Sequence, residues 1–128
     1  WLLPITSDNN SPSLKNEENA FSVQKLNSLR SEQKMVFLNF TADWCITCKV
    51  NEAIALNQDK VKKVLDEKNI IYLKADWTRK DPEIASMLAS YGRTGVPLYL
   101  LFPSQGDPII LPELLTEDLL LDFLKEIN

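Results

Sequence analysis

Apolar residues from position 20 onward fall into short continuous runs and into stripes with helical spacing. The runs predict buried strands at residues 35–40, 70–75 and 98–102, and a short apolar segment at 109–111 follows the last run after a turn. The stripes predict helices that begin near these residues: Ser22, Cys45, Asp59, Asp81 and Thr116. Ser, Asp and Thr at four of these starts are typical helix caps, so the pattern predicts a chain of regularly alternating elements.

The order of the predicted elements limits how they can be connected. Strand, helix and strand in succession require parallel pairing with a right-handed crossover, whereas the segments 98–102 and 109–111 are close enough to form an antiparallel hairpin. The sequence therefore predicts an α/β domain, with a mixed central sheet flanked by helices on both faces. Its 128 residues are about the size of one domain.

Residues 1–19 differ in composition from the rest of the chain. Because positions 6–19 are rich in Ser, Asn, Pro and Glu, we expect residues 1–19 to form a flexible linker and residues 20–128 to form the domain. The apolar segment 1–5 is compatible with the end of a membrane helix or with a short apolar terminus. The longest other apolar run, 96–102, is far shorter than the roughly 20 residues that span a bilayer.

Charge and composition exclude several classes of function. Lys and Arg number 14 against 18 Asp and Glu, a net charge of −4, so there is no cation excess of the kind that binds nucleic acid. The chain has no histidine, which excludes Ser–His and Cys–His catalytic pairs and histidine zinc sites. Two cysteines are too few for a four-thiolate metal site. Any special chemistry must come from the cysteine pair.

Cys45 and Cys48 directly follow a predicted strand and open a predicted helix. Residues at i and i+3 share one helix face, so the two thiols can form a small-ring disulfide. Unpaired N–H groups and the helix dipole favour a thiolate at the first position, so we expect a lowered pKa for Cys45, with Cys45 attacking and Cys48 resolving. Three other interpretations stay open: a structural disulfide, half of a copper or zinc site shared by two chains, and two cysteines without a role.

Three further side chains lie close to the pair in the sequence. Glu52 shares its helical stripe with both cysteines; it would oppose thiolate formation and accept the Cys48 proton if sheltered, or else it is a solvated surface acid. Trp44 either offers partners a flat apolar contact or is a partly buried core tryptophan. Asp43 either caps the helix, where it would modulate the thiol pKa, or is solvated.

The segment FTADWCITCK, residues 40–49, resembles the active-site segment of the thioredoxin superfamily. More narrowly, residues 20 to 127 resemble the C-terminal thioredoxin-like domain of the DsbD family of membrane-spanning disulfide reductases. Several separated motifs carry this resemblance: ADWC at 42–45, KVNE at 49–52, KADWT at 74–78 and GRTGVPL at 92–98.

The resemblance implies a thioredoxin-like fold and an electron relay. In that family the domain lies in the periplasm, tethered to the bacterial inner membrane. It takes electrons from a transmembrane domain of the same polypeptide and passes them to an N-terminal periplasmic domain, and other periplasmic disulfide proteins are further partners. No organic cofactor or metal is required, because the redox-active disulfide of Cys45 and Cys48 carries the electrons.

The resemblance also implies roles for single residues. Pro97 would be cis and face the cysteines, and the Val96 backbone would pair with an extended partner segment; the sequence alone favours an ordinary trans-proline at a strand start. The family carries a glutamate at the position of Glu52, which favours the proton role. Many relatives have a buried, pKa-modulating aspartate at the position of Asn39. Because an amide does not titrate, Glu52 or water would have to handle the proton, and Asn39 would hydrogen-bond in the core.

Two alternative functions use the same residues. A free-standing periplasmic thioredoxin-like reductase or oxidase would need no transmembrane donor. A non-catalytic domain would hold copper between the thiols or act as an adaptor. A reduction potential separates reductase from oxidase, and titration with Cu(I) tests the copper site.

Overall fold

The computed structural model describes residues 19–128, in which the strands form one four-stranded mixed sheet. β1 pairs with β2 in parallel and with β3 antiparallel, and β4 is the antiparallel partner of β3. The strands lie in the order β2-β1-β3-β4, and their bounds are β1 (Val36–Thr41), β2 (Ile71–Asp76), β3 (Leu98–Phe102) and β4 (Ile109–Ile110). The predicted α/β class, parallel crossover and terminal hairpin are confirmed.

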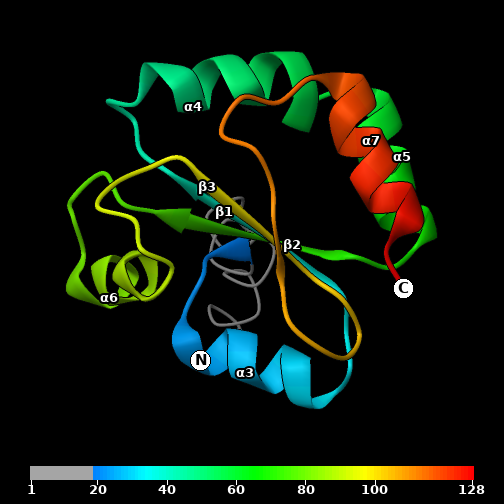
Figure 1. Cartoon of the computed structure of the whole chain (residues 1–128), viewed down its shortest axis with the longest axis horizontal. Helices are drawn as coiled ribbons and strands as arrows, with labels where there is room; N and C mark the ends of the chain where they lie inside the picture. The colour runs from blue at the N-terminus through cyan, green and yellow to red at the C-terminus, as the bar shows by residue number, and fades with distance from the viewer. Residues whose placement is uncertain (1–18) are drawn as a thin grey trace, which may run out of the picture.

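Helices cover both faces of the sheet (Figure 1). One face carries α3 (Val23–Ser31) and α6 (Pro82–Ser90). The other face carries α4 (Ile46–Asn51), α5 (Asp59–Glu67) and α7 (Glu117–Glu126). α4 continues directly into a π-helical turn, η1 (Glu52–Leu56). Each helix layer closes its own apolar core against the sheet.

β1 is buried along its whole length because strands flank it on both edges and helices cover both of its faces. Leu38 and Phe40 belong to the core under α3 and α6, whereas Phe37 belongs to the core under α5 and α7. Since side chains alternate along a strand, Asn39 and Thr41 point to the same face as Phe37. The strand therefore places two buried polar side chains on the face that α4 covers.

Three predicted helix caps are confirmed. The side chains of Ser22, Asp81 and Thr116 each accept a hydrogen bond from a first-turn backbone N–H. The predicted cap at Asp59 is wrong: Gln58 is the N-cap of α5, without a side-chain capping bond, and Asp59 is the first helical residue. An acid at that position still faces the positive end of the helix dipole, so it produces a similar sequence signal.

The apolar pattern does not predict the π-helical turn η1. The Asn57 N–H donates to the Glu52 carbonyl at 2.8 Å, which closes an i to i+5 ring. Such turns are rare and occur frequently at functional sites. Here the turn begins at Glu52, a residue that the sequence singled out for its chemistry.

The predicted linker over residues 1–19 lies outside the described residues, apart from Asn19. Ala20, the predicted start of the domain, forms a parallel bridge with Lys74 at the outer edge of β2. The Phe21 N–H extends this contact by donating to the Lys74 carbonyl at 2.9 Å. The chain is thus attached to the sheet from Ala20 onward, and the domain boundary itself stays a prediction.

Candidate redox site at the start of α4

Cys45 and Cys48 form a disulfide at the N-terminus of α4, with their Cα atoms 5.2 Å apart. Cys45 is the N-cap residue, and its Sγ accepts a hydrogen bond from the Cys48 N–H at 3.1 Å. A sulfur in this position lies among the unpaired N–H groups of the first turn, which stabilise a thiolate. Cys45 is 8% exposed and Cys48 is fully buried, so of the two sulfur-bearing residues only Cys45 is open to solvent.

The loop before β3 lies against the disulfide. Val96 packs on the small cluster that Ala42, Cys45 and Cys48 form. The Val96–Pro97 peptide bond is cis, as the resemblance implied, and Pro97 is buried immediately before β3. The fold thus brings Val96, 48 residues beyond Cys48 in the sequence, to the redox pair, with Pro97 next to it in the chain.

Trp44 stands beside the disulfide and is 50% exposed. Its Nε1 donates to the Thr78 carbonyl at 3.1 Å, and its ring packs against the buried Trp77 with ring centroids 5.9 Å apart. The Lys80 ammonium lies 5.5 Å from the centre of the Trp44 ring, within cation–π distance. Trp44 is therefore held in place by Trp77 and Thr78, and half of its surface is accessible.

Asp43 does not cap α4, because Cys45 is the N-cap. The Asp43 carboxylate is instead exposed and lies 3.5 Å from Lys49 Nζ. The Asp43 backbone N–H donates to Thr78 Oγ1 at 2.9 Å, which anchors the loop before the disulfide to the segment after β2. Thr78 is thus a supporting residue of the site.

Asp76 completes this anchor by accepting hydrogen bonds from both the Thr78 hydroxyl and the Thr78 N–H. Burial acts to raise the pKa of Asp76, but these two hydrogen bonds and the nearby lysine charges outweigh it and hold the pKa below its ordinary value. The carboxylate is therefore charged at neutral pH and keeps accepting from Thr78.

Glu52 is sheltered, with its side chain only 14% exposed. Its Oε2 accepts a hydrogen bond from Thr41 Oγ1 at 2.9 Å, and its Oε1 lies 3.9 Å from Lys49 Nζ. The Glu52 N–H donates to the Cys48 carbonyl, so the residue follows the buried cysteine by one helical turn. Glu52 is therefore not a solvated surface acid, and its carboxylate faces the end of β1.

Buried polar side chains extend from Glu52 across the sheet. Asn39 Nδ2 donates to the Tyr72 hydroxyl at 2.8 Å, while Asn39 Oδ1 is buried and has no partner among residues 19–128. Asn51 Nδ2 donates to the Tyr99 hydroxyl at 2.9 Å, and Asn51 Oδ1 accepts from the Leu115 N–H at 3.1 Å. We call the following six residues the polar layer: Asn39, Thr41, Asn51, Glu52, Tyr72 and Tyr99.

The charge of Glu52 affects the pKa of the two tyrosines of the polar layer. Burial raises the pKa of both hydroxyls, that of Tyr99 to about 12. The asparagine hydrogen bond at each hydroxyl acts to lower the pKa, and the nearby Glu52 carboxylate acts to raise it again. Both tyrosines are thus neutral at physiological pH, and the carboxylate is close enough to influence them.

Sequence reasoning missed Thr41, Asn51 and Thr78. One signal was present: Asn39 and Thr41 interrupt alternate positions of an otherwise apolar strand, so one buried face had to satisfy polar groups. No local pattern names their partners, because Glu52 and Tyr72 lie 11 and 33 residues away along the chain.

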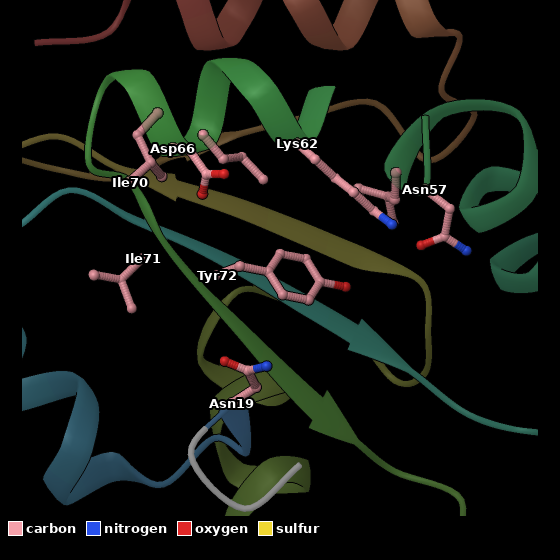
Figure 2. A pocket seen from close by; sticks show the side chains of 9 residues that line it. Asn19, Asn57, Lys62, Asp66, Ile70, Ile71 and Tyr72 are labelled. Atoms are coloured by element: carbon pink, nitrogen blue, oxygen red, sulfur yellow. The ribbon is translucent and has the colours of Figure 1, made fainter. Parts of the chain in front are cut away.

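A pocket of about 420 Å³ lies between α5 and β2 (Figure 2). Figure 2 shows the Tyr72 ring across the pocket, with Lys62 and Asp66 of α5 on one side and Asn19 on the other. None of the site residues predicted from the sequence is among the described residues that line it. Tyr72 connects the two regions, because its ring borders the pocket and its hydroxyl accepts from Asn39.

Within residues 19–128, no group of three or more His, Cys, Asp or Glu side chains is placed to hold a metal ion. Over the same described part of the chain, no helix combines the length and the apolar character needed to cross a bilayer.

The chain is similar to known proteins in both sequence and structure. A family model described as thioredoxin-like matches residues 18–104. The oxidised C-terminal domain of DsbD from Neisseria meningitidis is 30% identical, with 80% of this chain and 88% of that one covered and a TM-score of 0.66. The chain belongs to the thioredoxin-like family, among the C-terminal domains of DsbD. The reduced form of the Neisseria domain aligns with 27% identity and a TM-score of 0.68, covering 85% of this chain and 99% of that one.

The thioredoxin-like domain also matches a much longer protein. The thiol:disulfide interchange protein DsbD of Yersinia pestis is 38% identical over 80 residues, which are 62% of this chain but only 13% of that protein. With its Cys45–Cys48 pair, the thioredoxin-like domain is a thiol–disulfide oxidoreductase. These relatives do not favour a free-standing protein or a copper-binding adaptor.

Proposed function

We propose that this domain relays electrons from a transmembrane domain of a longer polypeptide to disulfides of periplasmic proteins, and so acts as a protein-disulfide reductase. The placement of the two sulfur atoms carries the proposal. Cys45 caps α4 at an 8% exposed position, and Cys48 is sealed behind it. The likeness to the thiol:disulfide interchange protein DsbD supports the membrane-bound donor.

The reaction exchanges one dithiol for one disulfide. The Cys45 thiolate attacks a sulfur of the partner disulfide, an S–S bond forms between the chains, and the partner's other sulfur leaves as a thiolate that takes up a proton. The Cys48 thiolate then attacks Cys45 Sγ and closes the intramolecular disulfide. The partner leaves with both cysteines reduced, and this domain has lost two electrons and two protons. A dithiol of the upstream domain restores the reduced pair by the reverse exchange.

Glu52 is the proposed acceptor of the Cys48 proton. Its carboxylate is sheltered and the residue follows Cys48 by one helical turn, so its charge would oppose a second negative charge at the pair. Asn39 modulates the thiol pKa only through hydrogen bonding, because its amide is neutral. Asp43 modulates it through the Lys49 charge, which lies between the Asp43 and Glu52 carboxylates.

Trp44, Val96 and Pro97 form the proposed docking edge for the partner. Trp44 offers an exposed aromatic face next to Cys45 in the chain, and Val96 packs against the cysteine cluster. An extended partner segment would pair with the Val96 backbone and so hold its disulfide over Cys45. We further propose that the domain needs no organic cofactor or metal, that it functions in the periplasm tethered to the inner membrane, and that its partners include an N-terminal periplasmic domain of the same polypeptide.

Trapping of the mixed disulfide tests the assignment of roles. When the reduced 128-residue chain is mixed with insulin, Cys48→Ser should accumulate a covalent complex through Cys45, and Cys45→Ser should accumulate none. Non-reducing gel electrophoresis and mass spectrometry measure the complex. The wild-type chain should instead turn over insulin disulfides without accumulating the complex. A complex with Cys45→Ser alone would reverse the roles of the two cysteines.

Two further measurements separate the relay from its alternatives. Equilibration with glutathione should place the potential of the pair on the reducing side, since an oxidase would lie far above the glutathione couple. Titration of the reduced chain with Cu(I) should show no tight stoichiometric binding. Tight copper binding together with absent insulin turnover would overturn the redox function.

A further inference from the structure

We infer that Thr41 is a positioning residue for Glu52, and that its hydroxyl holds the carboxylate on the inner side of α4, where the charge acts on the cysteine pair. This inference rests on the proposed function of Glu52. The known relatives point to the cysteines and the fold, whereas Thr41 emerges only from the contacts of this chain. Its Oγ1 donates to Glu52 Oε2 at 2.9 Å and is itself in a residue that is 1% exposed.

The backbone of Thr41 is fixed independently of its side chain. Thr41 pairs with Asp76 in the parallel β1–β2 ladder, and its carbonyl accepts from the Trp77 N–H at 2.7 Å. Strand alternation then directs the hydroxyl to the face covered by α4 and η1. The hydroxyl is therefore a donor held at the end of an inner strand, and it defines where the carboxylate can lie.

The partners of Glu52 lie on opposite sides of it. Lys49 Nζ, from α4, is 3.9 Å from Oε1, but the Lys49 side chain is 47% exposed and also lies 3.5 Å from Asp43. On the inner side, the carboxylate faces Thr41 of β1 and influences the pKa of Tyr72 of β2 and Tyr99 of β3. Without the Thr41 hydroxyl, Lys49 is the one side-chain partner left to Glu52 among residues 19–128, and it draws the carboxylate toward solvent.

The position of this charge matters for the thiols. A carboxylate held close to the pair disfavours a thiolate there, whereas a carboxylate in contact with solvent is screened. Loss of the Thr41 hydroxyl should therefore have the same sign as loss of the Glu52 charge. In both cases Cys45 should ionise at lower pH and react faster with an alkylating agent below neutral pH.

The experiment measures the rate of Cys45 alkylation by iodoacetamide against pH, in the reduced 128-residue chain carrying Cys48→Ser. Glu52→Gln should move the midpoint down by about 0.5 to 1 pH unit, a roughly three- to tenfold faster rate at pH below the midpoint. Thr41→Val should shift the midpoint in the same direction, and Thr41→Ser should leave it near that of the parent chain. Thr41→Val combined with Glu52→Gln should shift it no further than Glu52→Gln alone.

A comparison of four side chains at position 41 separates the effect of the hydroxyl from the effect of side-chain volume. Thr and Ser keep the hydroxyl, whereas Val and Ala lack it, and Val has nearly the shape of Thr. The profiles should group by hydroxyl and not by size, and the Ser and Ala pair decides the matter if Thr41→Val does not fold. Thermal unfolding, which senses packing at position 41, should instead separate the small side chains from the large ones.

The outcomes distinguish this inference from the function on which it rests. A shift with Glu52→Gln but none with Thr41→Val or Thr41→Ala would overturn the role of Thr41 alone. Equal shifts caused by Thr41→Val with and without Glu52→Gln would also overturn it, because the hydroxyl would then act without the carboxylate. No shift with Glu52→Gln would remove the effect of the Glu52 charge on Cys45, and with it the positioning role of Thr41. The mixed-disulfide trap would still test the relay itself.

Discussion

The two faces of the central sheet differ in the polarity of the side chains that they bury. The core under α3 and α6 is apolar and contains the inward faces of β1, β2 and β3, with the Trp77 indole N–H as its one buried polar atom without a partner among residues 19–128. The core under α5 and α7 merges into the polar layer beneath α4. All three residues in the described chain that are both polar and buried belong to that layer: Asn39, Thr41 and Asn51.

This difference shows on which face the fold buries polar side chains in place of apolar ones, beside the redox pair. A polar group inside a protein costs free energy unless a partner satisfies it, so each polar side chain in β1 demands another from a neighbouring element. Thr41 is satisfied by Glu52, and Asn39 is satisfied at its amide nitrogen by Tyr72. Both faces therefore bury an apolar core, and the polar layer on one of them also supports the redox pair.

Truncation on the apolar face should have the largest effect on stability and none on the thiols. Leu38 is fully buried in the core under α3 and α6, so Leu38→Ala should lower the free energy of unfolding by about 3 kcal/mol through lost apolar contacts and a cavity. Urea denaturation measures the loss, and Cys45 alkylation in the folded range of urea should keep its pH midpoint. A shifted midpoint would show that the two faces are not separate.

On the polar face, Asn51→Ala should lower the free energy of unfolding somewhat less than Leu38→Ala, but it should act on a particular loop. The Asn51 amide joins α4 to residues 113–115 by donating to the Glu113 carbonyl at 2.7 Å and accepting from the Leu115 N–H at 3.1 Å, and it also bonds Tyr99. Its loss leaves buried groups without partners, at a cost of about 2 to 3 kcal/mol. Hydrogen exchange at the Leu115 amide should accelerate more than exchange in β1.

Asn57→Ala is the matched control for Asn51→Ala. Asn57 follows the same helix at the end of η1 but is exposed, so its truncation should change stability by no more than about 0.5 kcal/mol. Equal losses from the two variants would mean that the asparagine network contributes nothing beyond helix propensity.

The same contrast explains how much the sequence could predict. Apolar runs and cap residues predict the strands and helices, because burial in layers imposes those periods on the chain. The redox pair was also predictable, since the strand before Cys45 and the helix after it fix the geometry of an i, i+3 pair. On the apolar face, the composition and the spacing of apolar residues together predict nearly all of the structure.

The polar layer was less predictable because its side chains form hydrogen bonds with partners that are distant in sequence. Asn39 was expected to hydrogen-bond in the core, but only the fold names Tyr72 as its partner. The pattern of the sequence left open whether Glu52 is a surface acid or a sheltered one, and its burial and the bond from Thr41 decide between them. The π-helical turn that begins at Glu52 has no signal in the local spacing of apolar residues.

Alkaline titration of Tyr99 should give the smallest effect on the free energy of unfolding. It tests the contrast between the two faces at a single hydroxyl. The Tyr99 pKa is about 12 against an ordinary 10.0, mainly because of burial, so folding favours its neutral form. This contribution is complete below pH 10 and is lost as the pH rises toward about 12. Tyr99→Phe should therefore flatten the fall of unfolding free energy over that window, measured by urea denaturation at several pH values. At neutral pH it should cost only about 1 kcal/mol, because Asn51 keeps its bond to the Glu113 carbonyl.

Tyr91→Phe is the matched control from the opposite face, where Tyr91 packs only partly buried against the apolar core. Burial also raises its pKa and the Asp107 charge adds to the rise, but the Arg30 charge opposes both, and solvent reaches the ring. Its removal should flatten the alkaline fall less than the removal of Tyr99. Equal flattening by the two variants would mean that a hydroxyl of the polar layer is no more strongly held in its neutral form than one at the margin of the apolar core. The contrast between the faces would then be one of composition alone, without an electrostatic consequence for the groups around Glu52.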